Sequence, residues 1–339
     1  MSVAIVAFDM KAQDDLEVLR QRLATTNVSD IRRMALLLRV AGEYEDGSRE
    51  KARAAVETLL ADFSLTDRTA FITVIGSEGA TTPCGFALIE GKPSAPVGAP
   101  RLALGLHFAP VLSEPEIGTA KFAQDVAGMV RKAIENGGMQ PDEVQCAIVN
   151  VPLPTSGNLG PRSRAGRAAA ALGAGIALGD LQSSAVTDER VIADSSLYTP
   201  RVQTFTGPAI RNVEIIIIGN SRQSGGDLVA CNTVTQDLID GRSIRRMLLQ
   251  AGCKMDADGE IDTSSVVAVL AKLGVMPDGS VNGAPTTIYS SVTPPEKHVR
   301  AAMSGLLGAV LHTTRIFGTF DPVQQAPLGG GTICCILKA

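Results

Sequence analysis

The sequence predicts an α/β protein built from three diverged copies of one unit. Aliphatic runs of four to seven residues, bounded by Gly, Pro or Asn, recur along the chain and are typical of strands covered by helices. Ala-rich segments between these runs favour helices that approach a sheet closely. Arg53, Arg167 and Arg300 each begin an Arg-Ala-Ala triplet that opens such a helix. The same order of elements at three places indicates triplication.

Composition limits the classes of function. The 339 residues are 45% hydrophobic and 19% charged, which allows a sizeable core. With no Trp, three Tyr and nine Phe, that core must consist mainly of Ala, Val, Ile and Leu, and stacking platforms for bases are not expected. The formal net charge is −4 and no long Lys/Arg block is present, so nucleic acid is not an expected partner.

The chain is also expected to be a soluble, cytoplasmic protein without a membrane partner. Its first residues become acidic after a short apolar start, unlike a secretory signal, and the longest aliphatic run, 215–218, is far too short for a membrane span. Six scattered cysteines form no C-x-x-C pair, which favours reduced thiols. Three histidines without i, i+4 spacing argue against a histidine metal site.

Each copy is predicted to contain a helix, a strand, an Ala-rich helix and two further strands. In the first copy these elements cover 14–24, 34–40, the helix carrying Arg53, 70–75 and 85–89. In the second they cover 121–136, 146–151, the helix carrying Arg167, 201–206 and 213–218. In the third they cover 264–273, 286–290, the helix carrying Arg300, 315–320 and 332–337. The copies predict units at 1–104, 105–240 and 241–339 within one compact globule.

Triplication has a consequence for function. Three equivalent strand ends can converge on one pseudo-threefold axis, where three related sets of side chains would line a single pocket. Such a pocket suits a flat ring with several carbonyl groups, because each copy can bind one edge of the ring. We therefore expect a small-molecule ring as the substrate.

Motifs along nearly the whole chain support this expectation. In chain order they are GSEG (76–79), VPLPT (151–155), GNS (219–221), SGGD (224–227), QDLID (236–240), RAA (300–302) and PLGGG (327–331). As an ordered set they resemble the ring-opening amidohydrolases, the family of cyanuric acid hydrolase and barbiturase. The resemblance implies three repeats forming a triangular prism around a central site, to which each repeat contributes a Ser, a Lys and an Arg. One Ser-Lys pair would attack a ring carbonyl, with oriented donors stabilising the oxyanion.

The three arginines that the resemblance implies correspond to Arg49 or Arg53 in the first copy, Arg167 in the second and Arg300 in the third. The lysine positions read Arg39, Asn150 and Ser290, and neither a guanidinium nor a carboxamide can act as a base. The serine positions fall near Val74, Phe205 and Thr319, so that no Ser-Lys pair is evident. Val323 or Gln324 replaces the acidic residue of the family's structural metal site, and no metal or cofactor is expected.

The candidate catalytic residues are therefore Ser77, Ser221 and Thr319. Ser77 lies in a predicted turn, where ordinary turn chemistry is the competing interpretation. Ser221 precedes a Gly-rich segment whose amides could face an oxyanion, although a plain connection explains that segment equally well.

The candidate substrate-binding residues lie at predicted helix starts and at turns after predicted strands. An arginine can bind a carbonyl or carboxylate through two donors, but each of these arginines can also simply cap or salt-bridge its helix. The set comprises Arg49, Arg53, Arg167, Arg300, Thr206, Gly76 and Gly207.

Three functional hypotheses follow from these residues. The first is an enzyme that hydrolytically opens a planar cyclic amide or imide, similar to cyanuric acid or a barbiturate. Because the Ser-Lys pairs are not evident, the second is an isomerase or lyase acting on a small carbonyl or carboxylate compound. The third is a non-catalytic ligand-binding or assembly protein. Assembly into a homo-oligomer is expected in addition.

Overall fold

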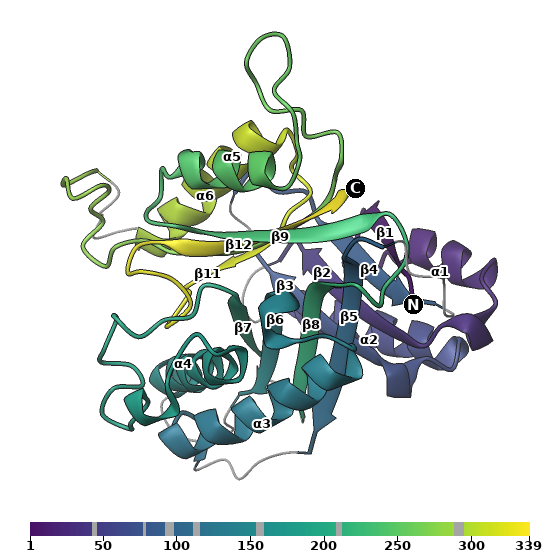
Figure 1. Ribbon diagram of the computed structural model, residues 1–339, viewed down its shortest axis with the longest axis horizontal. Helices are drawn as coiled ribbons and strands as arrows, with labels where there is room; N and C mark the ends of the chain where they lie inside the picture. Colours follow the sequence, from purple (N-terminus) through teal and green to yellow (C-terminus); the bar gives the residue numbers. More distant parts are fainter. Residues whose placement is uncertain are drawn as a thin grey trace.

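The structure is a computed structural model that describes residues 1–42, 46–76, 79–91, 98–110, 116–153, 159–207, 212–287 and 295–339. Within these ranges, no helix combines the length and the hydropathy needed to cross a bilayer. Three four-stranded sheets face one another, and the helices lie on the outside (Figure 1).

Each sheet belongs to one unit with the same order of elements, β-α-β-α-β-β. The first unit contains β1 (Val3–Asp9), α1 (Glu17–Ala24), β2 (Arg33–Val40), α2 (Ser48–Asp62), β3 (Thr69–Ile75) and β4 (Cys84–Glu90). The second contains β5 (Arg101–Ala109), α3 (Ala120–Asn136), β6 (Val144–Pro152), α4 (Leu159–Leu178), β7 (Val202–Gly207) and β8 (Val213–Ser221). The third contains β9 (Leu228–Thr235), α5 (Gly241–Gln250), β10 (Val266–Leu273), α6 (Pro295–Leu311), β11 (Phe317–Phe320) and β12 (Gly331–Lys338).

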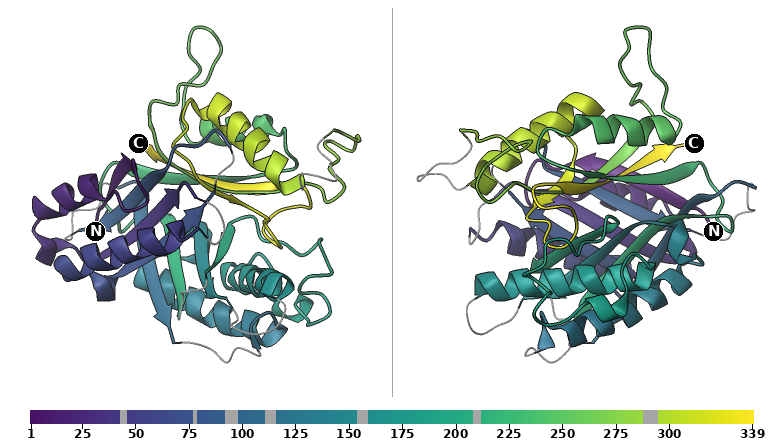
Figure 2. Two further views of the ribbon diagram at one scale, coloured as in Figure 1. Left: turned by 180° about the vertical axis from the view of Figure 1, so that it is seen from behind. Right: turned by 60° about the vertical axis from the view of Figure 1, so that its left-hand side comes forward.

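Strand order is the same in the three sheets. The first strand of each unit forms one edge, followed by the fourth, the second and the third, as in β1-β4-β2-β3, β5-β8-β6-β7 and β9-β12-β10-β11. The second and third strands pair in parallel, and the fourth strand runs antiparallel to the second. The common topology confirms the predicted pseudo-threefold repeats (Figure 2).

The sheets bury both of their faces. The outer face of each sheet packs against the two helices of its own unit, which forms three separate apolar clusters. The inner faces meet in a central cluster that draws on all three units, including Leu37, Ile148 and Leu270 from the second strands. Because side chains alternate between faces along a strand, a strand in this position must be apolar throughout, as in the run Ile215–Ile218 of β8.

Local sequence explains how the helices begin and how closely they approach. The side chain of Thr119 caps α3 by accepting a hydrogen bond from the amide of Phe122, and Asp240 caps α5 in the same way through Ser243. Gly173 lets α4 lie against α3, because a Cβ atom there would stand 2.2 Å from the carbonyl oxygen of Ala123. Alanines along the same helix, from Ala168 to Ala171, are fully buried.

The third copy was predicted with the wrong element. Residues 264–273 were expected to form its leading helix, but 266–273 form β10, and the leading helix is α5. A continuous apolar run has no periodicity that separates a buried strand from a buried helix, and the β-branched residues Val266, Val267 and Val269 favour the strand. Residues 286–287 are not in a strand, and the rest of the strand predicted over 286–290 lies outside the described residues.

The first strand of every unit was missed as well. β1, β5 and β9 each precede the helix that was taken as the start of a copy. We propose that the units divide in the connections β4–β5 and β8–β9, earlier than residues 104/105 and 240/241. A division at these connections keeps every sheet within one unit.

Truncating the central core is expected to destabilise the whole molecule. Ile148 is fully buried in the cluster shared by the three sheets. Ile148→Ala should lower the free energy of unfolding by about 2–5 kcal/mol, measured by chemical denaturation. The matched change Ile239→Ala, at a side chain that is 62% exposed, should cost less than about 0.5 kcal/mol.

Candidate functional site

The central core ends in a layer of unlike side chains. Residues paired in register point to the same face of a sheet, and successive side chains of a strand alternate between its two faces. The next inward-facing residue of each second strand is therefore the one two positions after Leu37, Ile148 or Leu270. The layer then contains one residue from each strand: Asp9, Cys84, Arg39 and Val74; Phe108, Glu214, Asn150 and Phe205; and Val234, Thr332, Lys272 and Thr319.

The register shows which residues are equivalent in the three units. Arg39, Asn150 and Lys272 occupy the same place on the second strands, and each lies beside its third-strand neighbour, Val74, Phe205 or Thr319 respectively. The lysine position of the third copy is therefore Lys272 and not Ser290, which lies outside the described residues. The sequence analysis found no Ser-Lys pair, and in the third unit a threonine lies beside the lysine, because Thr319 and Lys272 are register partners in adjacent parallel strands.

Both members of this pair lack partners for their polar atoms. The Oγ1 atom of Thr319 is buried and has no hydrogen-bond partner in the structure as described. The side chain of Lys272 is buried, and within the same residues its amine makes no hydrogen bond or ion pair. The amine lies 4.7 Å from the centre of the Phe205 ring, which belongs to the second unit. The amine thus lies where the second and third units meet.

The surroundings of Lys272 favour its neutral form. Burial lowers its pKa well below the ordinary value, the positive charge of Arg167 lowers it further, and Asp321 opposes the shift. The Phe205 ring favours the cation, but a desolvated cation–π contact is worth only about 2 kcal/mol. Full burial of a lysine can lower its pKa by up to about 3–5 units, so desolvation outweighs the ring. A neutral amine beside a hydroxyl group is a competent base.

Arg167 and Asp321 form a partly buried link between the second and third units. The guanidinium donates to both the backbone carbonyl and a carboxylate oxygen of Asp321, at 2.8 and 2.6 Å. This charge and hydrogen bond outweigh the effect of burial and hold the pKa of Asp321 below its usual range. Asp321 is held at a φ of +62°, in the left-handed region, which costs of order 1 kcal/mol and often marks functional turns.

The first unit meets the third through Arg39, at the same end of the sheets. Arg39 donates from Nε to Thr81 at 2.8 Å and from Nη1 to the carbonyl of Gly318 at 2.6 Å. The guanidinium of Arg300 stacks on the Phe320 ring at 3.8 Å. Both arginines line a cavity of about 30 Å³ together with Thr319. The first unit thus brings a positive charge close to β11.

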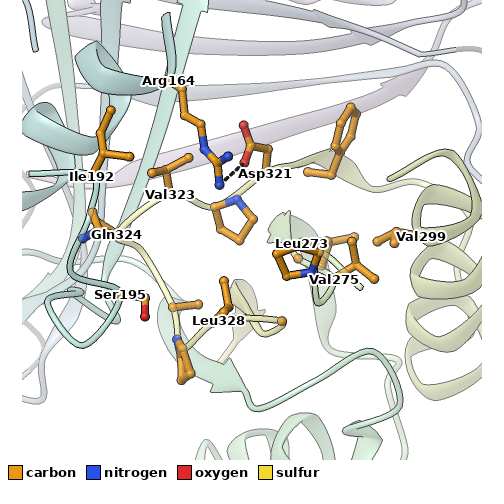
Figure 3. A pocket seen from close by; sticks show the side chains of 17 residues that line it. Arg164, Ile192, Ser195, Leu273, Val275, Val299, Asp321, Val323, Gln324 and Leu328 are labelled. Carbon is orange, nitrogen blue, oxygen red and sulfur yellow. Dashed lines mark ion pairs between the residues drawn. The ribbon is translucent and has the colours of Figure 1, made fainter. Parts of the chain in front are cut away.

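A larger cavity of about 430 Å³ lies at the carboxyl ends of β10 and β11 (Figure 3). In α/β proteins, ligands bind at this end of parallel strands. Leu273 and Phe320, which directly follow Lys272 and Thr319, belong to its wall. Most of the lining is apolar, and one side carries the ion pair of Arg164 with Asp321 at 3.7 Å.

The predicted arginines occupy different surroundings. Arg167 contacts Asp321 and Arg300 contacts Phe320, two consecutive residues at the end of β11. Arg53 lies over the ring of Phe71, bonds Glu57 at 3.0 Å and acts electrostatically on Glu214 of the second unit. Arg49 is in the first turn of α2.

The predicted hydroxyl-bearing residues and glycines also lie in different surroundings. Thr206 is hydrogen-bonded to Ser163 at 2.9 Å, and Gly207 ends β7. Gly76 lies against Arg39, where a Cβ atom would stand 2.9 Å from Nη2. Ser77 is outside the described residues.

Ser221 lies at the far end of its strand. It follows Glu214 by seven positions on β8, about 23 Å along the strand from the inner layer, and its hydroxyl bonds the carbonyl of Gly138. This position gives it no part in the site described above.

The residues that the sequence analysis missed are Lys272, Asp321 and Glu214. Lys272 was missed because the segment that contains it was predicted as a helix and not as a strand. Asp321 directly follows the segment predicted as a strand over 315–320, where no acidic side chain was singled out. Glu214 lies opposite Asn150 on the antiparallel strand, and burial raises its pKa above the ordinary value despite the hydrogen bond from Asn150 and the charge of Arg53. Aligning the three copies by strand register would have revealed all three.

The burial of Lys272 should make stability depend on pH. Between the lowered pKa of the folded state and about 10.4 in the unfolded chain, the unfolded state binds more protons, so stability rises with pH. Lys272→Met should therefore raise the free energy of unfolding at neutral pH by about 1–3 kcal/mol, and this gain should shrink toward pH 10. Denaturation of both proteins across this range measures the difference. The exposed control Lys254→Met should show no such trend, and a constant gain for Lys272→Met would contradict a neutral buried amine.

Comparisons with known proteins agree with this geometry. The family described as amidohydrolase ring-opening protein matches residues 4–338. A cyanuric acid amidohydrolase of Enterobacter cloacae is 30% identical over 294 residues, covering 80% of each chain. A cyclic amide hydrolase of Azorhizobium caulinodans is 26% identical over 366 residues, covering both chains completely. A solved structure of a cyanuric acid hydrolase, 25% identical, superposes with a TM-score of 0.90 over 100% of this chain and 99% of the other. The chain therefore belongs to the ring-opening amidohydrolase family.

Proposed function

We propose that this protein hydrolytically opens a planar cyclic amide or imide, with Thr319 as the nucleophile and Lys272 as its base. The observation that carries the proposal is the register pairing of a buried hydroxyl that has no hydrogen-bond partner among the described residues with a buried lysine at the end of the shared core. The relatives named above are hydrolases of cyanuric acid or cyclic amides, which favours hydrolysis over the isomerase, lyase and non-catalytic alternatives. A cytoplasmic location and a homo-oligomeric state stay predictions.

The chemistry follows from the protonation states of the pair. Neutral Lys272 takes the proton of the Thr319 hydroxyl while its oxygen attacks a ring carbonyl carbon. The resulting oxyanion is stabilised by the guanidinium groups of Arg39 and Arg300, which share the small cavity with Thr319. The carbon–nitrogen bond then breaks, and the ring nitrogen takes the proton from Lys272. Water, deprotonated by the same amine, hydrolyses the acyl-threonine ester, releases the opened acid and restores Thr319.

Arg167 and Asp321 position and tune this pair without reacting. Arg167 neutralises Asp321 and also disfavours a proton on Lys272. The turn that carries Asp321 is in addition tied to the second unit, since Gln324 donates to the carbonyl of Asp194 at 2.6 Å. This arrangement holds the end of β11, and hence Thr319, in a defined place.

Removing the hydroxyl of Thr319 should abolish ring opening. With cyanuric acid and barbituric acid as substrates, Thr319→Val should lower kcat by about 10³-fold or more, measured by loss of ring absorbance. Thr319→Ser, which keeps the nucleophile, should stay within about tenfold of the native rate. The control Thr58→Val, at an exposed position of α2, should be unaffected. Full activity of Thr319→Val would refute the assignment of the nucleophile.

The rate should follow the titration of Lys272. Because the base must be neutral, kcat/KM should rise with pH and reach a plateau above the pKa of Lys272, which lies well below about 10.4. Arg167→Met removes the positive charge near the amine, so the rising limb should move to higher pH. Profiles of both proteins at saturating and limiting substrate measure this shift. A shift toward lower pH would contradict the assigned electrostatics.

A further inference from the structure

The cavity of about 430 Å³ lies on the opposite face of β10 and β11 from the pair proposed for catalysis. Leu273 follows Lys272 and Phe320 follows Thr319, and successive side chains of a strand point to opposite faces. Leu273 accordingly packs in the outer apolar cluster of the third unit together with Val299 of α6, and both residues line the cavity. The cavity is therefore a second site and not part of the inner layer.

The second and third units enclose this cavity with mostly apolar side chains (Figure 3). Its volume lies within the range of about 300–1,000 Å³ that is usual for small-molecule sites. Among the lining residues, Ile192 of the second unit is 44% exposed and Leu328 of the third unit is 47% exposed. Large apolar side chains that remain in water beside a cavity indicate a surface that a bound molecule covers.

Arg164 supplies the charge of this site. Its side chain is 51% exposed, and its guanidinium lies 3.7 Å from a carboxylate oxygen of Asp321, farther than the about 2.7–2.9 Å of a hydrogen-bonded charge pair. The same carboxylate already accepts a hydrogen bond from Arg167 at 2.6 Å. Asp321 is the only acidic residue among the lining residues that the structure describes. Two guanidinium groups therefore share one carboxylate, which leaves this side of the cavity with an excess of positive charge.

The charge and the apolar walls together select the ligand. A monoanion balances the excess positive charge, and a carboxylate can accept two parallel hydrogen bonds from one guanidinium. An apolar body attached to that carboxylate removes Ile192, Leu328 and the half-buried Val275 from water. A purely polar anion would leave these walls in water, and a neutral apolar molecule would leave the guanidinium of Arg164 without an anion.

We infer that this cavity binds a small carboxylic acid in its anionic form, with the carboxylate on Arg164 and an apolar body between Ile192, Val275 and Leu328. The inference goes beyond the proposed function, because the site lies outside the inner layer and requires neither Thr319 nor Lys272. Binding therefore tests it whether or not the protein opens rings.

Titration calorimetry with three compounds tests the inference. 4-Phenylbutyrate has both features, 4-phenylbutanamide keeps the apolar body without the charge, and acetate keeps the carboxylate without the body. The native protein should bind 4-phenylbutyrate at least about fivefold more tightly than the amide, a factor that suits a half-exposed ion pair. It should bind 4-phenylbutyrate at least about tenfold more tightly than acetate, because acetate covers little of the apolar wall.

Variants of the charged and the apolar wall locate the bound acid. Arg164→Met should abolish the preference for 4-phenylbutyrate over the amide. The control Arg245→Met, at an arginine of α5 that is 44% exposed and lies 3.2 Å from Glu260, should keep that preference. Leu328→Asp should weaken the binding of 4-phenylbutyrate by at least about tenfold, whereas Leu249→Asp, at a leucine of α5 that is 43% exposed, should leave it unchanged.

The two test variants are independent of each other. Both change half-exposed side chains, so each should melt like the native protein, and either one suffices if the other does not fold. Equal binding of the acid and the amide by the native protein, or no binding of any compound, would overturn the inference. Native affinity and preference in Arg164→Met and Leu328→Asp would place the acid at another site and overturn it as well.

Discussion

The constraint on which this structure depends is the meeting of three inner sheet faces in one apolar core. Each sheet already buries its outer face against its own helices, so that the inner faces can be removed from water only against one another. At the edge of that core the alternation of every strand continues, and the next inward side chains form the layer that contains Lys272 and Thr319. The site is thus a consequence of how the core ends.

The electrostatics of the layer follow from the same packing. β10 carries Lys272 into the interior, where it lies near the Phe205 ring and the charges of Arg167 and Asp321. Arg167 donates one hydrogen bond to the carboxylate of Asp321 and another to its backbone carbonyl. A buried amine without an acid partner is a stability cost, and at a site it is also a source of reactivity.

The backbone of the three units follows one repeated pattern, but the side chains of the layer do not. Strand order and register are common to the units, while the equivalent positions carry a guanidinium in Arg39, a carboxamide in Asn150 and an amine in Lys272. Arg39 now joins the first unit to β11 through Gly318, and Asn150 is bound to Glu214. One scaffold position therefore carries three different side chains in the three units, because the frame depends on apolar alternation and not on the layer.

The sequence by itself determined the class of fold and the number of units, because apolar runs, small-residue helices and recurring triplets are local signals. It also indicated Thr319, through its place near the serine position of the family pattern. The pairing of Thr319 with Lys272, the opposition of Asn150 and Glu214 and the link from Arg167 to Asp321 were decided by the tertiary structure. These contacts join residues from different strands and units, and a shift of one residue in register would turn each side chain to the other face. The run 266–273 is apolar almost throughout, so its sequence has no hydrophobic periodicity that shows which side chains point inward. Only the pairing of this strand with β11 and β12 shows that Lys272 points into the interior.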